Sequence, residues 1–349
     1  MQNVQTDIKN LEIETLKNLS NSKSKNTLRA YKSDFGNFSA FCISNGFNYL
    51  PTQPQIVALY LTKISKTSKF STLKRRIASI SVIHKLKGHY LDIKHPIIIE
   101  NLHGIKRNIG TRQLSKKPML INNLKLLINV INNNIVNNTE LKIRKEKFEL
   151  INSRDKALIL IGFAGGFRRS ELVNIEYNDI EFVDEGVKIL VKKSKTDQSG
   201  EGHIKAIPYF DNKTYCPVLA LQNYIKLKFV NKNQGMIFDI SDKSVALIVK
   251  KYAEKAGLDA SQYAGHSLRS GFATSAAEFG AEERNIMAMT GHKTTQMVRR
   301  YIQEANLFKN NPLNKIKIWL NQIFIQSHGQ KSLLLDGFIF LGLKIILFL

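Results

Sequence analysis

The sequence predicts a mainly α-helical protein with one small antiparallel β-sheet, divided into two domains. Apolar residues recur at helical spacings of three and four over most of the chain, and the strand-like runs fall within residues 179–208. A chain of 349 residues, 43% of them hydrophobic, is long enough to bury two separate cores. A basic stretch with little apolar content, residues 107–118, is the predicted linker between them.

Residues 24–106 are predicted to form a small all-α bundle of four short amphipathic helices. Ser24 or Asn26 is placed to cap the first helix, and Pro54 suits the first turn of the second. The third is predicted to begin with Ser71 as its cap, and a weaker fourth follows. The apolar stripe of the first helix consists of Leu28, Tyr31, Phe35, Phe38 and Cys42.

The chain carries a formal net charge of +24 and has a pI near 9.9. A surplus of this size is the electrostatic footprint of a nucleic-acid-binding protein. The alternative is compositional drift, because an AT-rich genome also enriches lysine, but drift does not explain where the arginines fall. Basic clusters on a helix are often only a solvated face. We nevertheless predict phosphate contacts for Lys74, Arg75, Arg76, Lys106, Arg107 and Arg112.

Residues 119–325 are predicted to form the second, α+β domain. A largely apolar helix at residues 155–164 is broken by Gly165-Gly166, which places Arg168 at the start of a new helix. Three strands follow at residues 179–183, 187–192 and 204–208, and Lys195 enters the hairpin between the last two.

Neither end of the chain contributes to these domains. Residues 1–23 are polar and contain acidic groups, so they are not a signal peptide. Residues 326–349 form an apolar tail of uncertain role. Its strongly apolar part, residues 333–349, is 17 residues long and contains two charges, so it falls short of a convincing membrane span and no membrane partner is expected. Three interpretations compete: a helix that docks on a partner subunit, a weak membrane anchor, or an extension from a shifted or read-through reading frame. The first and the last are favoured.

The two cysteines, Cys42 and Cys216, lie far apart and lack metal-ligand spacing, so neither a disulfide nor a zinc site is predicted. Free buried thiols are typical of a reducing cytosol, and we expect a cytoplasmic protein.

The residues that carry chemistry are basic groups and one tyrosine. His266 and Arg269 are three apart on a predicted helix and face the same way. Gly291-His292 follows, and Tyr301 comes nine positions later in a polar setting. With Arg168 and Lys195 these residues make a cationic set that suits a phosphodiester, without an acidic pair or a metal-ligand cluster. Glu171 lies three positions after Arg168 and can hold its side chain.

These motifs resemble the tyrosine recombinase (phage integrase) family, and the resemblance runs from about Ser24 to Tyr301. The family's G-x-R-x-S-E-L stretch matches residues 166–172, its H-x-L-R box matches residues 266–269, and its Gly-His precedes the tyrosine at the usual distance. The hairpin lysine of the family corresponds to Lys195, although Lys192 and Lys193 are close by. The tail after about Phe324 departs from the family pattern.

The resemblance implies an N-terminal helical core-binding (SAM-like) domain and a tyrosine-recombinase catalytic domain. It implies that Tyr301 attacks a DNA phosphodiester and forms a 3′-phosphotyrosyl link, while Lys195 protonates the leaving 5′ oxygen. Arg168 and Arg269 can fork onto the phosphate oxygens, and His292 can donate one more hydrogen bond. His266 is placed to act as general base. No metal, ATP or other cofactor is expected.

Expected partners are double-stranded DNA, further copies of the chain in a homotetramer on two DNA sites, and accessory DNA-bending or directionality proteins. The apolar stripe Leu313, Ile316, Leu320, Ile323 and Phe324 would dock on a neighbouring subunit or pack on its own domain. The function expected is integration or excision of a mobile element, or Xer-like resolution. The alternatives are a topoisomerase-like enzyme that nicks and reseals one strand, and a decayed DNA-binding remnant of a mobile element.

Overall fold

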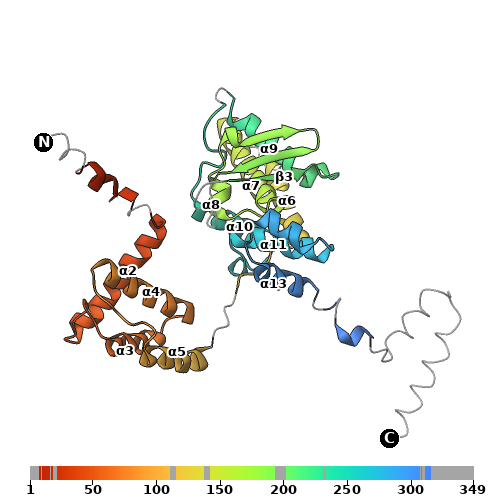
Figure 1. The fold of residues 1–349 in the computed structure, drawn as a ribbon. Helices are drawn as coiled ribbons and strands as arrows, with labels where there is room; N and C mark the ends of the chain where they lie inside the picture. The colour runs from red at the N-terminus through yellow and green to blue at the C-terminus, as the bar shows by residue number, and fades with distance from the viewer. Residues whose placement is uncertain are drawn as a thin grey trace, which may run out of the picture. The chain divides into compact units, whose positions relative to one another are not determined.

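The computed structural model describes residues 8, 10–15, 17–18, 22–110, 115–136, 142–192, 202–230, 233–306, 308 and 311–315 (Figure 1). The chain divides into two compact units, residues 1–114 and 115–349. Within the described residues, no helix is both long and apolar enough to cross a membrane.

The first unit is built from α2 (Lys25–Ser44), α3 (Pro54–Ser65), α4 (Phe70–Leu86) and α5 (Pro96–Ile109). The Ser24 side chain accepts a hydrogen bond from the Thr27 amide at the start of α2, and a proline opens both α3 and α5. Packing of α2 on α4 and of α3 on α5 buries one apolar core. Its fully buried members include Phe38, Tyr60, Leu61, Leu73, Ile80 and Ile98.

Two boundaries differ from the expectation. α4 begins at Phe70, one residue before the expected cap Ser71, because the Lys69 carbonyl already accepts from the Thr72 and Leu73 amides. α5 continues to Ile109, so residues 107–109 belong to the helix and not to the predicted linker, and Lys106 and Arg107 lie in its last turn. Basic side chains in a last helical turn favour this continuation, because they complement the negative end of the helix dipole.

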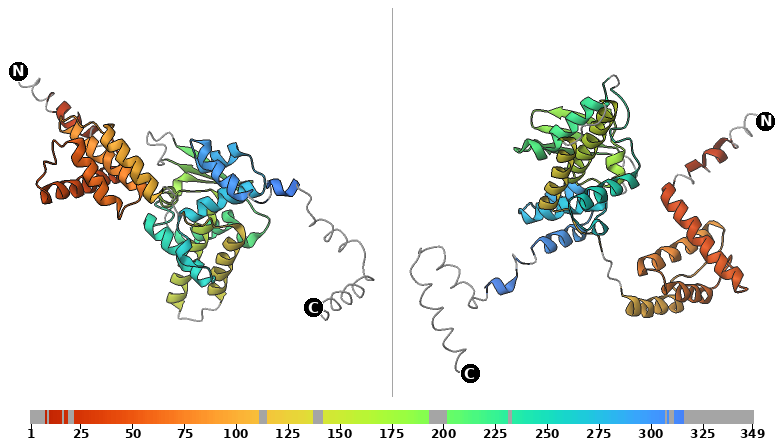
Figure 2. Two further views of the ribbon diagram at one scale, coloured as in Figure 1. Left: turned by 90° about the horizontal axis from the view of Figure 1, so that it is seen from below. Right: turned by 180° about the vertical axis from the view of Figure 1, so that it is seen from behind.

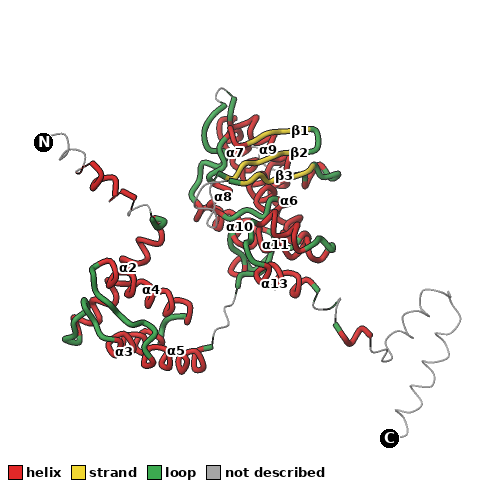
Figure 3. Tube along the Cα trace, in the orientation of Figure 1, coloured by secondary structure: helices red, strands yellow, loops and turns green. Residues whose placement is uncertain are grey.

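The second unit contains eight helices among its described residues (Figures 1 and 3). They are α6 (Ile121–Val136), α7 (Lys142–Ala164), α8 (Arg169–Val173), α9 (Pro217–Lys228), α10 (Asp242–Lys255), α11 (His266–Glu278), α12 (Glu283–Thr290) and α13 (Thr295–Ala305). α7 starts well before the expected residue 155. The sequence of its first half is largely charged and shows no apolar stripe, so periodicity alone did not predict this part of the helix.

The sheet is three-stranded and antiparallel in the order β1 (Ile180–Val183), β2 (Gly186–Val191) and β3 (His203–Pro208). The register pairs Val187 with Ile207 and Ile189 with Lys205. β3 contacts α9, while α11, α12 and α13 pack together at the other end of the unit (Figures 2 and 3). The predicted fold class, mainly helical with one small antiparallel sheet, is confirmed.

Extended residues 115–120 lie against this unit. The Lys117 amide donates to Gln262 O and the Met119 amide to Ser267 O, both at 2.8 Å. Gly271 on α11 is required here, because a Cβ at that position would collide with the Met119 backbone oxygen. The C-terminal part of the predicted linker is therefore fixed to the unit that contains the functional site.

Candidate active site

The turn between α7 and α8 positions Arg168 at the site. α7 ends at Ala164, Gly166 adopts a positive φ of 54°, and Arg168 becomes the N-cap of α8. Glu171, one turn later, accepts from both the Arg168 amide, at 2.9 Å, and the Arg168 guanidinium. Burial acts to raise the pKa of Glu171, but its hydrogen bonds with Arg168 and the nearby charges hold that pKa below its ordinary value. Glu171 therefore stays ionised and orients Arg168.

Arg269 lies on α11 and is almost completely buried, at 1% exposure. Its Nη1 donates to Gly166 O at 2.8 Å, and its Nη2 lies 3.0 Å from His292 Nε2. Burial, together with the charge of Arg168, lowers the pKa of Arg269 to about 10. Arg269 is still charged at neutral pH, and its backbone contact ties it to the turn that positions Arg168.

His292 follows α12, which ends in the left-handed residue Gly291 (φ 61°). Gly291 O accepts from Arg168 Nη2 at 3.1 Å. Because a guanidinium only donates, His292 Nε2 is the acceptor from Arg269, and the ring proton lies on Nδ1, which donates to Thr290 Oγ1 at 2.8 Å. Burial and the charges of Arg269 and Arg168 lower the pKa of His292 to about 4. His292 is therefore neutral in this structure.

Arg168, Arg269 and His292 open onto one pocket of about 540 Å³. Its lining residues are Arg168, Arg169, Ser170, Asp242, His266, Arg269, His292, Lys293, Thr294 and Met297. His266 is exposed at the start of α11. Of the described residues in the pocket wall, Asp242 is the one acidic residue, and the others are basic or neutral. A pocket with this charge suits an anion such as a phosphodiester.

Tyr301 lies on α13 next to the pocket wall. It packs against a small apolar cluster of Ala273, Ala277, Ile286 and Val298, and its ring centroid is 6.1 Å from that of His292. It is half-buried, and burial raises the pKa of Tyr301 above its ordinary value, although the charge of Arg269 opposes this. In this state the phenol is protonated at neutral pH, so attack by Tyr301 needs a proton acceptor.

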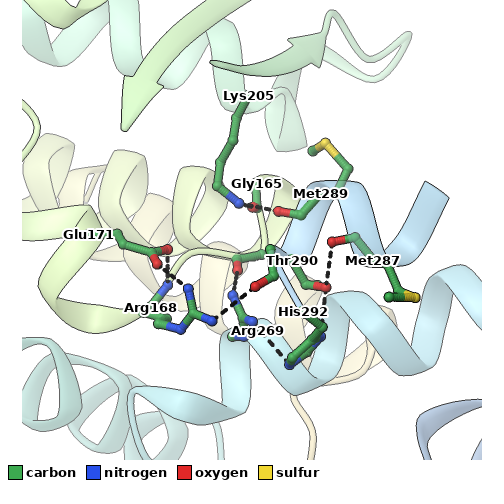
Figure 4. Close-up of polar contacts among 11 residues, drawn as sticks. Gly165, Arg168, Glu171, Lys205, Arg269, Met287, Met289, Thr290 and His292 are labelled. Carbon is green, nitrogen blue, oxygen red and sulfur yellow. Dashed lines mark hydrogen bonds and ion pairs between the residues drawn. The ribbon is translucent and has the colours of Figure 1, made fainter. Parts of the chain in front are cut away.

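The structure thus brings together six of the predicted residues from α8, α11, α12 and α13 or their ends: Arg168, Glu171, His266, Arg269, His292 and Tyr301. Figure 4 shows the polar network that connects the arginines, Glu171 and His292. Lys195 and Lys193 lie outside the described residues. Lys192 is described, and its Nζ pairs with Glu176 at 2.5 Å and Asp179 at 2.8 Å.

The predicted phosphate-contacting residues of the first unit are only partly available. Arg75 Nη1 pairs with the buried Asp34 at 2.7 Å, and Arg76 donates to Asn37 and to the Tyr60 hydroxyl. Lys74 lies over the Phe70 ring and is exposed, as are Lys106 and Arg107. Arg112 lies outside the described residues.

Sequence reasoning missed Lys205, which is buried on β3 and reaches the same site. The available signal was strand alternation. Lys205 and Ile207 share the inward face of β3, so a lysine occupies a position where the pattern requires an apolar residue.

Within the described parts of the chain, no group of three or more His, Cys, Asp or Glu is arranged to hold a metal ion.

Comparison with known sequences identifies relatives over most of the chain. The phage integrase family profile matches residues 133–307. An integrase/recombinase xerD homolog from Selenomonas ruminantium is 39% identical over 321 residues, which cover 88% of this chain and 89% of the relative. The tyrosine recombinase XerC of Syntrophus aciditrophicus is 25% identical over 316 residues, covering 83% and 91% of the two chains.

Solved structures share the fold at low sequence identity. A XerH site-specific recombinase in a post-cleavage complex with difH substrate superimposes with a TM-score of 0.55 at 15% identity, covering 76% of this chain and 72% of that one. A lambda integrase dimer bound to a COC′ core site gives a TM-score of 0.52 at 15% identity, covering 84% and 75%. On the strength of the family match and the relative from Selenomonas ruminantium, this chain belongs to the phage integrase family of tyrosine recombinases.

Proposed function

We propose that this recombinase cuts and rejoins duplex DNA at specific sites through a 3′-phosphotyrosyl intermediate on Tyr301. One observation carries the proposal: Arg168, Arg269 and His292 form a single hydrogen-bonded network at a basic pocket, and Tyr301 stands beside that network. Because both guanidinium groups are already fixed to backbone carbonyls, they can stabilise developing charge with little reorganisation.

In the cleavage step the Tyr301 oxygen forms a bond to phosphorus and the bond from phosphorus to the 5′ oxygen breaks. The phenol proton passes to a base, and His266, exposed on the pocket wall, is the candidate. The leaving oxygen takes a proton from Lys195. The phosphotyrosyl ester retains the energy of the broken bond, so rejoining to a 5′-hydroxyl needs no further energy source.

The contacts of His292 define a further requirement. Nε2 accepts from Arg269, so it cannot donate to a phosphate in this state. A bound phosphodiester would draw Arg269 Nη2 toward its own oxygen and would favour a proton on Nε2, because negative charge stabilises the imidazolium. We therefore propose that DNA binding raises the pKa of His292 and converts this ring from acceptor to donor.

The proposed partners are double-stranded DNA and three further copies of the chain, in a tetramer on two sites, with accessory bending or directionality proteins. The XerH recombinase is bound to its difH substrate and lambda integrase to a COC′ core site, which supports DNA as the partner proposed for this chain. We further propose that the protein acts in the cytoplasm on a mobile element, by integration or excision, or on chromosome dimers.

The test is an SDS-resistant adduct assay on nicked, labelled DNA from the flanks of the protein's own gene, with Tyr301→Phe as the matched control. We expect an adduct with the native chain and none with Tyr301→Phe, although both bind the DNA. An adduct that persists in Tyr301→Phe would exclude this nucleophile. Binding without an adduct would favour a decayed remnant, and resealing without partner exchange would favour a topoisomerase-like activity.

A further inference from the structure

A lysine ammonium lies buried at the point where the ends of two helices meet. Lys205 is 1% exposed and points inward from the middle of β3, opposite Ile189 of β2. A buried lysine loses its hydration, so its ammonium must be satisfied by protein groups. The groups that satisfy it show what the residue does.

The partners of the ammonium are two backbone carbonyls and an aromatic ring. Lys205 Nζ donates to Gly165 O at 2.7 Å and to Met289 O, and it lies 4.8 Å from the Phe167 ring centroid (Figure 4). Gly165 directly follows α7, and Met289 lies in the last turn of α12. Carbonyls at helix C-termini lack intrahelical partners and carry partial negative charge. One cation therefore satisfies the ends of two helices at once.

These two helix ends position the residues that face the pocket. The turn after α7 contains Gly166, whose carbonyl accepts from Arg269, and leads directly into Arg168. The end of α12 leads into Gly291, whose carbonyl accepts from Arg168, and then into His292. Among the described residues, Lys205 contacts both segments without lining the pocket itself. Its effect on a bound anion is therefore indirect.

We propose that Lys205 is a positioning residue for strand cleavage: by holding the ends of α7 and α12 together, its ammonium fixes Arg168, Arg269 and His292 around the scissile phosphate. The identity of the reaction in this statement rests on the proposed function. We call this contact of the Lys205 ammonium with Gly165 O and Met289 O the clamp. If the clamp positions the site, any phosphate in the pocket should bind less well when the ammonium is removed.

The charge of the clamp responds to its surroundings. Burial lowers the pKa of Lys205 to about 7, the charge of Glu171 opposes this, and the charges of Arg269 and Arg168 add to it. His292 is also within electrostatic reach, and His203 lies two positions away on the same face of β3. A bound phosphate favours the charged ammonium, so the clamp is strengthened when the pocket is occupied.

The experiment uses the full chain and three variants at this position. Lys205→Met removes the charge and the donors at similar length, Lys205→Gln keeps an amide donor, and Lys205→Arg keeps the cation. Lys188→Met is the matched control, because Lys188 lies on the adjacent strand, is only partly buried and pairs only with Glu181 among the described residues. Thermal melting establishes whether each variant folds.

Two readouts separate the clamp from the proposed function. Inorganic phosphate is titrated while the His292 ring nitrogens are followed by NMR, and adduct formation is timed at saturating DNA. We expect Lys205→Met to weaken phosphate binding about tenfold and to slow adduct formation about 100-fold, because small displacements of catalytic groups have effects of this size. DNA affinity should change less than about threefold, since DNA is held mainly by contacts elsewhere. Lys205→Arg should restore most of both losses, and Lys188→Met should lose neither.

The proposal is overturned if folded Lys205→Met or Lys205→Gln matches the native chain in both readouts. It is also overturned if both variants unfold and Lys205→Arg restores only folding, because Lys205 would then serve stability alone. If the native chain forms no adduct but phosphate binding still depends on Lys205, the proposed function fails and the clamp stands.

Discussion

The two units each contain a buried carboxylate with two arginines, but they use the arrangement differently. In the first unit Asp34 pairs with Arg75 and Arg76, whose side chains remain 46% and 19% exposed. In the second unit Glu171 pairs with Arg168, at 13% exposure, while Arg269 and Lys205 are each 1% exposed. Exposed arginines keep much of their hydration, whereas the buried cations of the second unit depend on backbone carbonyls.

The acid and the arginines have different roles in the two units. In the first unit the arginines neutralise a buried acid and so stabilise the packing of α2 on α4. At the candidate site of the second unit, Glu171 orients Arg168, and the positive charges of Arg168 and Arg269 face an open pocket. Such an excess of positive charge lowers the stability of the folded chain and is expected at a site that binds an anion.

The largest effect is expected from Arg269→Met. Removing one preorganised donor to a transition-state oxygen should slow adduct formation about 100- to 1,000-fold. The same change should raise the pKa of His292 from about 4 toward its ordinary range, because the charge of Arg269 lowers it. Adduct kinetics and NMR titration of His292 measure both effects. A His292 pKa unchanged in this variant would contradict the described contact.

The second prediction contrasts the two acids directly. Glu171→Gln leaves Arg168 without its charged partner, so the second unit should lose about 3 kcal/mol of unfolding free energy and cleavage should slow. Asp34→Asn should cost about 1 kcal/mol, because Arg75 remains solvated, and should leave cleavage at saturating DNA unchanged. Denaturant unfolding and adduct kinetics of both variants provide the test. Equal losses of activity would remove the distinction between the units.

The third prediction concerns pH. His292 and His84 are both held neutral. The pKa of His292 is lowered to about 4, and the pKa of His84 is lowered by burial and by the charge of His89. The unfolded chain binds these protons near pH 6.5, so both units should lose stability progressively as the pH falls below about 6.5.

Hydrogen exchange resolved by unit can separate the two contributions. His292→Gln should reduce the acid dependence of the second unit down to about pH 4 and leave that of the first unit intact. Bound DNA should have the opposite effect on His292, since a phosphate favours the imidazolium. If the acid dependence of the second unit survives in His292→Gln, another group is responsible.

The smallest effect is expected from Lys192→Met. Lys192 is half-exposed and pairs with Glu176 and Asp179, so its loss should cost no more than about 1 kcal/mol. Cleavage should change less than about threefold, in contrast to Lys195→Met, if Lys195 is the general acid. Parallel adduct kinetics of the two variants decide this. A large loss in Lys192→Met alone would transfer the role of acid to Lys192.

Much of this protein could be predicted from local patterns. Helical spacing revealed the four helices of the first unit, and Pro54 marked the start of α3. Periodicity failed for the first half of α7, where charged residues hide the helix, and α5 runs past its predicted end. The site residues lie in short motifs that can be recognised from the sequence without knowledge of the contacts: Arg168, His266, Arg269, His292 and Tyr301.

The family, the fold class and the residues expected around a phosphate could be predicted from the sequence, because they depend on composition, spacing and local motifs. The contacts that hold these residues follow from the folded chain: His292 accepts from Arg269, Lys192 pairs with two acids, and Lys205 lies between the ends of α7 and α12. These contacts join residues that are not neighbours in the sequence, and those of Lys205 are made to backbone carbonyls. Every residue has a carbonyl, so no pattern of side chains can reveal which ones a buried cation will meet.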